Sequence, residues 1–203
     1  MKVIYLFVLL LIGTTVQSQV VINPKVGANF MRLSSDPSGD NASQKARLGW
    51  NAGIDVRVGD RIMIVPGIHY VRYGSILRGT KDNENFDDEV YTHFIKVPIM
   101  VAGNLVTTNA FVLRLYGGPY ANFLIGVDKN IVFDKDNFKS FNGGLKAGLG
   151  FDLGIFTLDL DYEYGLSKVF AEKLFDKILF PDNAKMGVIN LSIGVKFGDI
   201  MKG

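Results

Sequence analysis

Two histidines and one acidic triplet are the residues of this sequence whose types and spacing could support chemistry. His69 and His93 have acidic neighbours at Asp87, Asp88 and Glu89, so a base and an orienting carboxylate are both present in the sequence. Alternation along the two predicted strands places His69 on one face and His93 on the opposite face. The histidines are therefore not expected to converge. We predict no catalytic residue and no enzymatic activity.

The acidic triplet Asp159-x-Asp161-x-Glu163 has the composition of a cation site but not its spacing. Residues two apart on a strand lie about 6.6–7 Å from each other along one face, which is too far for one ion to bind all three carboxylates. A row of acids that pairs with Lys146 and Lys196 on neighbouring strands is the favoured interpretation. We predict no metal and no cofactor.

The composition excludes several other classes of protein. The chain has 203 residues, with 22 Lys and Arg against 20 Asp and Glu, a balance that does not favour nucleic-acid binding. The absence of cysteine excludes disulfides, thiolate zinc sites, thiol catalysis and the acylated cysteine of a lipoprotein. The 23 Gly, 15 Phe and 8 Tyr favour strands, and the length suits one all-β domain.

The first 18 residues have the pattern of an export signal. Lys2 is followed by ten apolar residues, and Val16 and Ser18 fit a cleavage site before Gln19. An apolar run of ten residues is much shorter than the ~20 that a membrane-spanning helix needs. We predict a signal peptide over residues 1–18 and one domain over residues 19–203, which could enter a membrane only as strands.

Eight segments alternate apolar and polar residues with the period of two that an extended strand produces. They cover residues 20–31, 48–58, 62–72, 91–101, 111–125, 144–153, 156–164 and 188–197. The third segment is the least regular, because Met63 and Val65 add apolar side chains to its polar face. Gly117-Gly118-Pro119 interrupts the fifth segment, where a bulge or bend is expected.

The connections between these segments alternate in length. The short ones are Gly59-Asp60, residues 103–110 and Gly154-Ile155, and the long polar ones are residues 34–47, 73–89, 126–141 and 165–187. Short turns at one end and long loops at the other are typical of an outer-membrane barrel, whereas a Greek-key sandwich has no reason to sort its connections. We predict an all-β fold, an eight-stranded antiparallel up-and-down transmembrane β-barrel.

Charge distinguishes the two faces of the predicted wall. The apolar faces carry almost no charge apart from Arg72 and His93, and a Lys or Arg facing mid-bilayer would cost roughly 2–4 kcal/mol. The polar faces should therefore line the lumen, which eight strands leave just wide enough for side chains to fill. The predicted lumen network of paired charges and tyrosines consists of Lys25, Asp55, Arg57, Lys96, Arg114, Tyr116, Tyr120, Lys146, Asp152, Asp159, Asp161, Glu163 and Lys196.

Aromatic residues on the apolar faces form two predicted girdles, as at the two interfaces of membrane barrels. The girdle near the long loops contains Trp50, Tyr70, Tyr91, Tyr162 and Tyr164, and the one near the short turns contains Phe111, Phe151, Phe156 and Phe197. Residues 169–180 of the last long loop have helical apolar spacing. They could form an amphipathic helix that caps the barrel mouth or contacts lipid or a partner.

The ordered set of motifs resembles the PorT-like family of outer-membrane β-barrel domain proteins. The segments that carry the resemblance are Ile64-Val-Pro-Gly-Ile-His-Tyr70, Phe94-Ile-Lys-Val-Pro-Ile-Met100, Gly117-Gly-Pro-Tyr-Ala-Asn-Phe-Leu-Ile-Gly126, residues 143–150, Asp161-Tyr-Glu-Tyr-Gly-Leu166 and Asn190-Leu-Ser-Ile-Gly-Val-Lys-Phe197. The resemblance implies an outer-membrane location and insertion by the barrel-assembly machinery. It implies no uniform biochemical activity.

Function is predicted at the level of a class. We expect a monomeric integral outer-membrane protein, in contact with outer-membrane lipid, that has a structural or interaction role. Its extracellular loops would carry recognition of a protein partner, and no nucleic acid is expected. Two alternatives remain open at this point: an exported soluble lipocalin-like barrel that binds a small apolar ligand, and a narrow porin-like pore.

Overall fold

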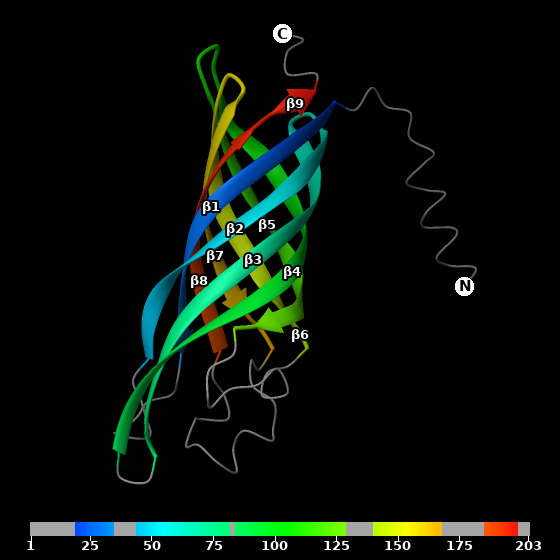
Figure 1. Ribbon diagram of the computed structural model, residues 1–203. Helices are drawn as coiled ribbons and strands as arrows, with labels where there is room; N and C mark the ends of the chain where they lie inside the picture. The colour runs from blue at the N-terminus through cyan, green and yellow to red at the C-terminus, as the bar shows by residue number, and fades with distance from the viewer. Residues whose placement is uncertain (1–18, 35–43, 82–83, 129–139, 168–184, 199–203) are drawn as a thin grey trace, which may run out of the picture.

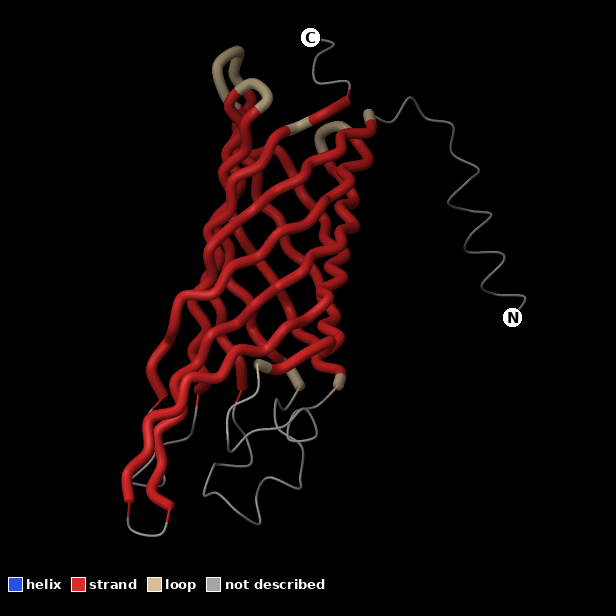
Figure 2. The backbone as a smooth tube through the Cα atoms, viewed as in Figure 1, coloured by secondary structure: helices blue, strands red, loops and turns tan. Residues whose placement is uncertain are grey.

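A computed structural model describes residues 19–34, 44–81, 84–128, 140–167 and 185–198 (Figure 1). Strands make up nearly all of this part of the chain (Figure 2), and no helix within it is long and apolar enough to cross a bilayer. The strands are β1 (Val20–Ser34), β2 (Gln44–Gly59), β3 (Ile62–Lys81), β4 (Glu84–Thr107), β5 (Val112–Val127), β6 (Phe141–Leu153), β7 (Phe156–Gly165), β8 (Lys185–Val195) and β9 (Phe197–Gly198).

The strands form one antiparallel sheet that closes on itself between β1 and β8. Consecutive strands pair in order from β1 to β8, and β1 then pairs with β8 through partners such as Asn29 and Asn190. The two-residue β9 continues β8 beyond Lys196 and pairs with the start of β1 through Phe197 and Ile22. Closure leaves no sheet edge within the wall. The predicted eight-stranded antiparallel barrel is confirmed.

The two faces of the wall differ in chemistry, as β7 illustrates. Its residues alternate strictly between exposed and buried from Phe156 to Gly165. Leu158 and Leu160 point outward and are about half exposed, whereas Asp159 and Asp161 point into the lumen and are buried. A surface of outward aliphatic side chains suits lipid and not water. A water-soluble barrel with an apolar interior would show the opposite arrangement, so the lipocalin-like alternative is wrong.

Connections are sorted by length along the barrel axis. The tight turns after β2, β4 and β6 lie at the end of the barrel where β1 starts and β9 ends (Figures 1 and 2). Two of these turns contain glycines with positive φ, Gly59 at 132° and Gly154 at 56°, a backbone conformation that side chains with a Cβ seldom adopt. The third turn is shorter than predicted, because β4 extends to Thr107 and leaves only residues 108–111.

One predicted loop, residues 73–89, is largely strand, and the prediction of a loop there is wrong. β3 and β4 continue beyond the rest of the barrel rim as a paired hairpin, with partners from Gly74 and Tyr91 to Lys81 and Glu84 (Figure 1). Each strand thereby satisfies the backbone polar groups of the other outside the bilayer. The predicted signal peptide and the predicted amphipathic helix at 169–180 lie outside the described residues.

The register shifts of the sheet also differ from the expectation. β5 keeps an unbroken register with β6 through Gly117-Gly118-Pro119, so the expected bulge is absent from this part of the described sheet. A Cβ at Gly118 would lie 2.8 Å from the Cα of Met100, so this glycine permits a close approach of β4. The shifts instead lie between Arg47 and Trp50 in β2, and at two places between β4 and β5.

Candidate functional site

The lumen contains a network of ion pairs, which begins near the short turns at Asp152. Arg57 and Arg114 each donate to this carboxylate over 2.8 Å, and Lys196 Nζ lies 3.2 Å from it. All four side chains are nearly excluded from solvent. Since burying an unpaired charge is costly, this convergence is what allows an acid and three bases to share the interior.

The middle of the network is centred on Lys25 of β1. Its Nζ lies 2.6 Å from both Asp55 Oδ2 and Asp159 Oδ2. Asp55 also accepts from His69 Nε2 at 2.7 Å, and Asp159 accepts from Arg114 at 2.9 Å. The lysine therefore links carboxylates on β2 and β7, which lie on either side of the β1–β8 seam.

Asp161 lies next in the acidic row of β7, toward the long-loop end. Lys146 Nζ approaches Asp161 to 3.0 Å, and Tyr116 Oη donates to the same carboxylate over 3.1 Å. Asn190 Nδ2 donates to its other oxygen over 2.6 Å. Three donors thus surround one buried carboxylate, which stabilises the ionised acid in the interior.

Glu163 completes the acidic row and is fully buried. Lys96 Nζ lies 2.5 Å from its Oε1, and Tyr73 Oη donates to its Oε2 over 3.1 Å. Lys146 contributes a longer contact of 3.6 Å. The Nζ of Lys96 also lies 5.3 Å from the ring centroids of Tyr73 and Tyr120, so aromatic rings surround the buried lysine.

The structure places each side chain of the lumen network proposed from the sequence on the inner face of the wall. The pairing differs in one respect: Lys196 contacts Asp152, whereas Lys25 and Arg114 contact Asp159. The Tyr120 hydroxyl finds no hydrogen-bond partner among the described residues. Among these residues, no three His, Asp or Glu side chains are grouped so that they could hold a metal ion.

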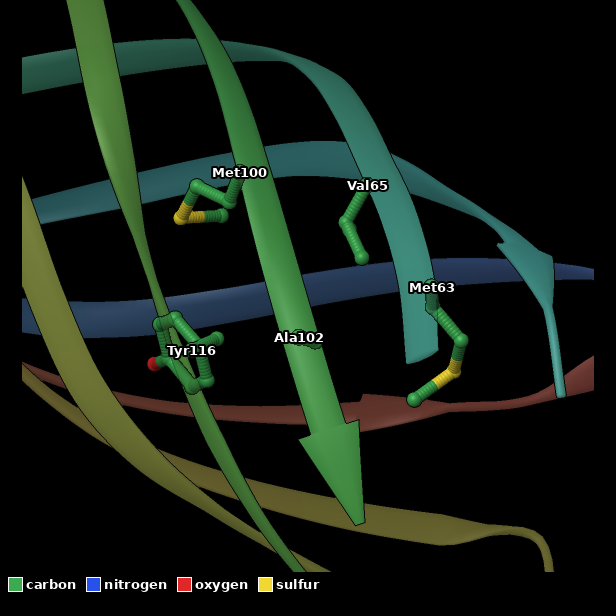
Figure 3. Close-up of a cluster of buried hydrophobic side chains, with 5 residues drawn as sticks. All are labelled: Met63, Val65, Met100, Ala102 and Tyr116. Atoms are coloured by element: carbon green, nitrogen blue, oxygen red, sulfur yellow. The ribbon is translucent and has the colours of Figure 1, made fainter. Parts of the chain in front are cut away.

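Sequence reasoning did not predict that apolar side chains cluster in the lumen, although it placed Tyr116 there and Met63 and Val65 on the polar face of their segment. Met63, Val65, Met100, Ala102 and Tyr116 form a buried cluster on the inner side of β3, β4 and β5 (Figure 3). A second group of buried side chains lies nearer the long loops and includes Met31, Val71, Tyr73, Phe94, Leu124, Met186 and Val188. The presence of Met63 and Val65 on the polar face of their segment was the available signal.

The lumen is filled by these side chains. The cavity among the ionic residues has a volume of about 20 Å³. A single water needs roughly 10–15 Å³ by this measure, so the cavity holds about one water molecule. A barrel of eight strands is expected to be filled by side chains in this way.

The predicted girdle residues lie on the outer face of the wall. Trp50 and Tyr70 are in contact near the long-loop end, with ring centroids 5.1 Å apart, and Phe111 stacks on Phe151 at 4.9 Å near the short turns. Tyr162, Tyr164, Phe156 and Phe197 are exposed outward. Sequence reasoning did not include three further outward aromatic residues, Phe30, Phe123 and Phe141.

The two histidines occupy opposite faces of the wall. His69 is buried in the lumen beside Asp55, whereas His93 lies on the outer face. The two ring nitrogens of His93 contact Tyr70 Oη at 2.5 Å and Asp128 Oδ1 at 2.9 Å. The hydrogen bond from Arg72, and then the one from His93, lowers the pKa of Asp128 below its usual value.

The fold and the lumen together define a class of protein. A closed antiparallel barrel with an apolar outer surface and an ionic interior is an integral membrane barrel of the bacterial outer-membrane type. Residues 16–171 match the family described as outer membrane protein beta-barrel domain, and the chain belongs to this family. The protein is therefore located in the outer membrane.

The chain is similar to several solved outer-membrane proteins, one of them with a TM-score above 0.5. The outer membrane protein OprG from Pseudomonas aeruginosa is 13% identical, with a TM-score of 0.51 over 89% of this chain and 96% of that chain. Neisserial surface protein A is 14% identical, with a TM-score of 0.49 over 87% and 97%. Ail of Yersinia pestis, solved with the heparin analogue sucrose octasulfate, is 15% identical, with a TM-score of 0.45 over 88% and 99%. No curated protein matches the chain.

Proposed function

We propose that the protein is a monomeric, non-conducting and non-enzymatic outer-membrane barrel with an interaction or structural role on the outer surface of the cell. The filled lumen is the observation that carries this proposal. Its charged side chains form ion pairs with one another, and the cavity between them has space for about one water molecule. An interior of this kind supports a role for the outer surfaces instead of solute transfer.

The hairpin of β3 and β4 supports an interaction role. Its paired strands continue to Lys81 and Glu84, beyond the level where the other described strands end (Figure 1). The β4 side carries Asp87, Asp88 and Glu89. A paired hairpin presents a partner with a more ordered surface than a free loop, which lowers the entropic cost of binding.

The same proposal includes the route of the chain to the membrane. Residues 1–18 would act as a cleaved signal peptide, and the barrel-assembly machinery would insert the remaining chain with the aromatic Phe197 in the last strand. The ordered motifs that resemble the PorT-like family support membership of that branch. Outer-membrane lipid would be the permanent surrounding of the apolar outer wall.

Photo-crosslinking in intact cells tests the interaction role. A benzoylphenylalanine residue is introduced at Asp87 in the hairpin, or at Arg61 in the turn at the opposite end as a matched control. We expect a discrete crosslinked protein band from position 87 that is absent from position 61. The same residue is also introduced at Asn85. If neither position 87 nor position 85 gives such a band, the hairpin is not the interaction surface and this part of the proposal fails.

A further inference from the structure

A second group of charged side chains lies on the outer face of the wall near the long-loop end. This group, called the rim cluster below, consists of Arg47, Trp50, Tyr70, Arg72, Tyr91, His93 and Asp128. We propose that the rim cluster binds the phosphate group of a lipid in the outer leaflet. The inference rests on the membrane location and not on the proposed interaction role.

The rim cluster marks the boundary of the apolar outer surface at the long-loop end. Trp50, Arg72 and His93 lie directly opposite one another on β2, β3 and β4. Farther along the same outer face, toward the short turns, the side chains are aliphatic: Ile54 and Ile68 are paired partners, and Ile99 is exposed. Lipid headgroups lie at the boundary between an apolar band and a belt of Trp, Tyr and Arg. The rim cluster is thus at the depth of a headgroup.

Two β-bulges assemble the rim cluster. Strict alternation would place Arg47 and Trp50 on opposite faces of β2, but the register shift between them turns both side chains outward. Arg47 Nε accordingly donates to Tyr91 Oη over 3.2 Å. A second shift, between β4 and β5, lies at His93, next to its contact with Asp128. Bulges of this kind often redirect side chains beside functional sites.

Gly74 provides space for the aromatic ring between the two arginines. A Cβ at this position would lie 2.8 Å from Tyr91 Cε1 and 3.2 Å from Arg47 Cβ. With glycine there, the guanidinium of Arg72 lies over the Tyr91 ring, 3.7 Å from its centroid. Stacking on a ring fixes the plane of an arginine while its edge remains available for hydrogen bonds.

Arg72 has donors for an additional anion. Its Nη2 donates to Asp128 Oδ2 over 2.9 Å, and within the described part of the chain this is the guanidinium's polar contact. The guanidinium has five N–H groups in a fork that matches phosphate oxygens, and the Arg72 side chain is 31% exposed. Asp128 accepts from Nη2 alone, so the remaining N–H groups of this fork can donate to a phosphate oxygen.

The surroundings of Arg72 suit a lipid phosphate. The N–H groups that Asp128 leaves available lie beside an aromatic surface provided by Trp50 and Tyr70. Toward the short turns, the aliphatic side chains of Ile54 and Ile68 offer a surface for acyl chains. The combination fits an amphiphile with a phosphate headgroup better than free phosphate.

Trp50, the only tryptophan of the chain, is the reporter for the test. The refolded protein is placed in phosphatidylcholine vesicles that contain brominated phosphatidic acid or, for comparison, brominated phosphatidylcholine. Quenching of Trp50 fluorescence gives the relative association constant of the two lipids. We expect a several-fold preference for phosphatidic acid in the natural protein. A ratio of one would overturn the proposal.

Two variants locate the effect. Arg72→Gln is expected to reduce the preference to about one, whereas Arg61→Gln, which removes the same charge from the exposed turn at the opposite end, is expected to leave it unchanged. Equal preferences in the natural protein and Arg72→Gln would contradict the proposed site. Gly74→Ala provides a second variant in case Arg72→Gln does not fold, and it should also lower the preference.

Inorganic phosphate distinguishes the two sources of the ligand. Millimolar phosphate in the buffer should leave the lipid preference of the natural protein intact, because free phosphate lacks the acyl chains that contact the aliphatic wall. Loss of the preference at that concentration would show that the site takes free phosphate, and the lipid assignment would then be wrong.

Discussion

The lumen network and the rim cluster contain the same types of residue, but they differ in solvent exposure. In the lumen, six bases and five acids lie almost entirely out of contact with solvent, and each acid accepts from at least two side chains. In the rim cluster the Asp128 side chain is 51% exposed and that of its partner Arg72 is 31% exposed. The buried charges of the lumen stabilise one another, whereas the partly exposed Arg72 keeps N–H groups that can donate to a ligand.

Removal of one buried acid should have the largest effect on stability. Glu163→Gln would remove the carboxylate charge that lies 2.5 Å from Lys96 Nζ and 3.6 Å from Lys146 Nζ. Breaking a buried ion pair costs about 3–5 kcal/mol, because an uncompensated charge remains. The free energy of unfolding can be measured by urea titration in lipid vesicles, with Trp50 fluorescence as the signal.

Asp128→Asn at the rim is the matched control for that loss. Its ion pair with Arg72 is partly exposed, so the expected change is below about 1 kcal/mol. Similar losses in the two variants would mean that the lumen and the rim cluster do not differ energetically as described.

A lysine scan along the outer face of β4 should give the next largest effect. Ile99→Lys places a charge on the aliphatic part of the wall and should reduce stability by about 2–4 kcal/mol, whereas His93→Lys at the rim should cost about 0–1 kcal/mol. The measurement is again unfolding in vesicles, with folded barrel detected by its faster migration before boiling on SDS gels. Equal costs would contradict the assigned depth of the rim cluster.

The smallest expected effect is the pH dependence of the Asp128 interaction. Because the pKa of Asp128 is lowered in the folded protein, its interactions with Arg72 and His93 are fully present above the unfolded value of 3.8 and are lost as the pH falls through the folded value. The difference in unfolding free energy between the natural protein and Asp128→Asn should therefore vanish well below pH 3.8. A difference that grows on acidification would reverse the sign and refute the linkage.

The wall could be predicted from the sequence, because strand alternation and connection length are local properties. The apolar lumen cluster was harder to predict, since Met63 and Val65 disturb the alternation without indicating what they contact across the barrel. The hairpin was missed because its polar composition is that of a loop, and only pairing between β3 and β4 makes it strand.

The rim cluster could not be assembled from the sequence. Arg72 and His93 stood out as charges on an apolar face, but Asp128 belonged to a predicted loop. Arg47 reaches the outer face only through a bulge, and bulges depend on register between strands. Alternation within a single strand contains no information about that register.

Single-channel recording in planar bilayers tests the central claim, that the charged lumen is a filled interior and not a conduit. With a general porin as the positive control, the natural protein should give no current steps above background at 1 M KCl, because the space among its ionic residues is about 20 Å³. Reproducible steps that persist in protein shown to be folded by its mobility before boiling would contradict the account and identify the protein as a narrow pore.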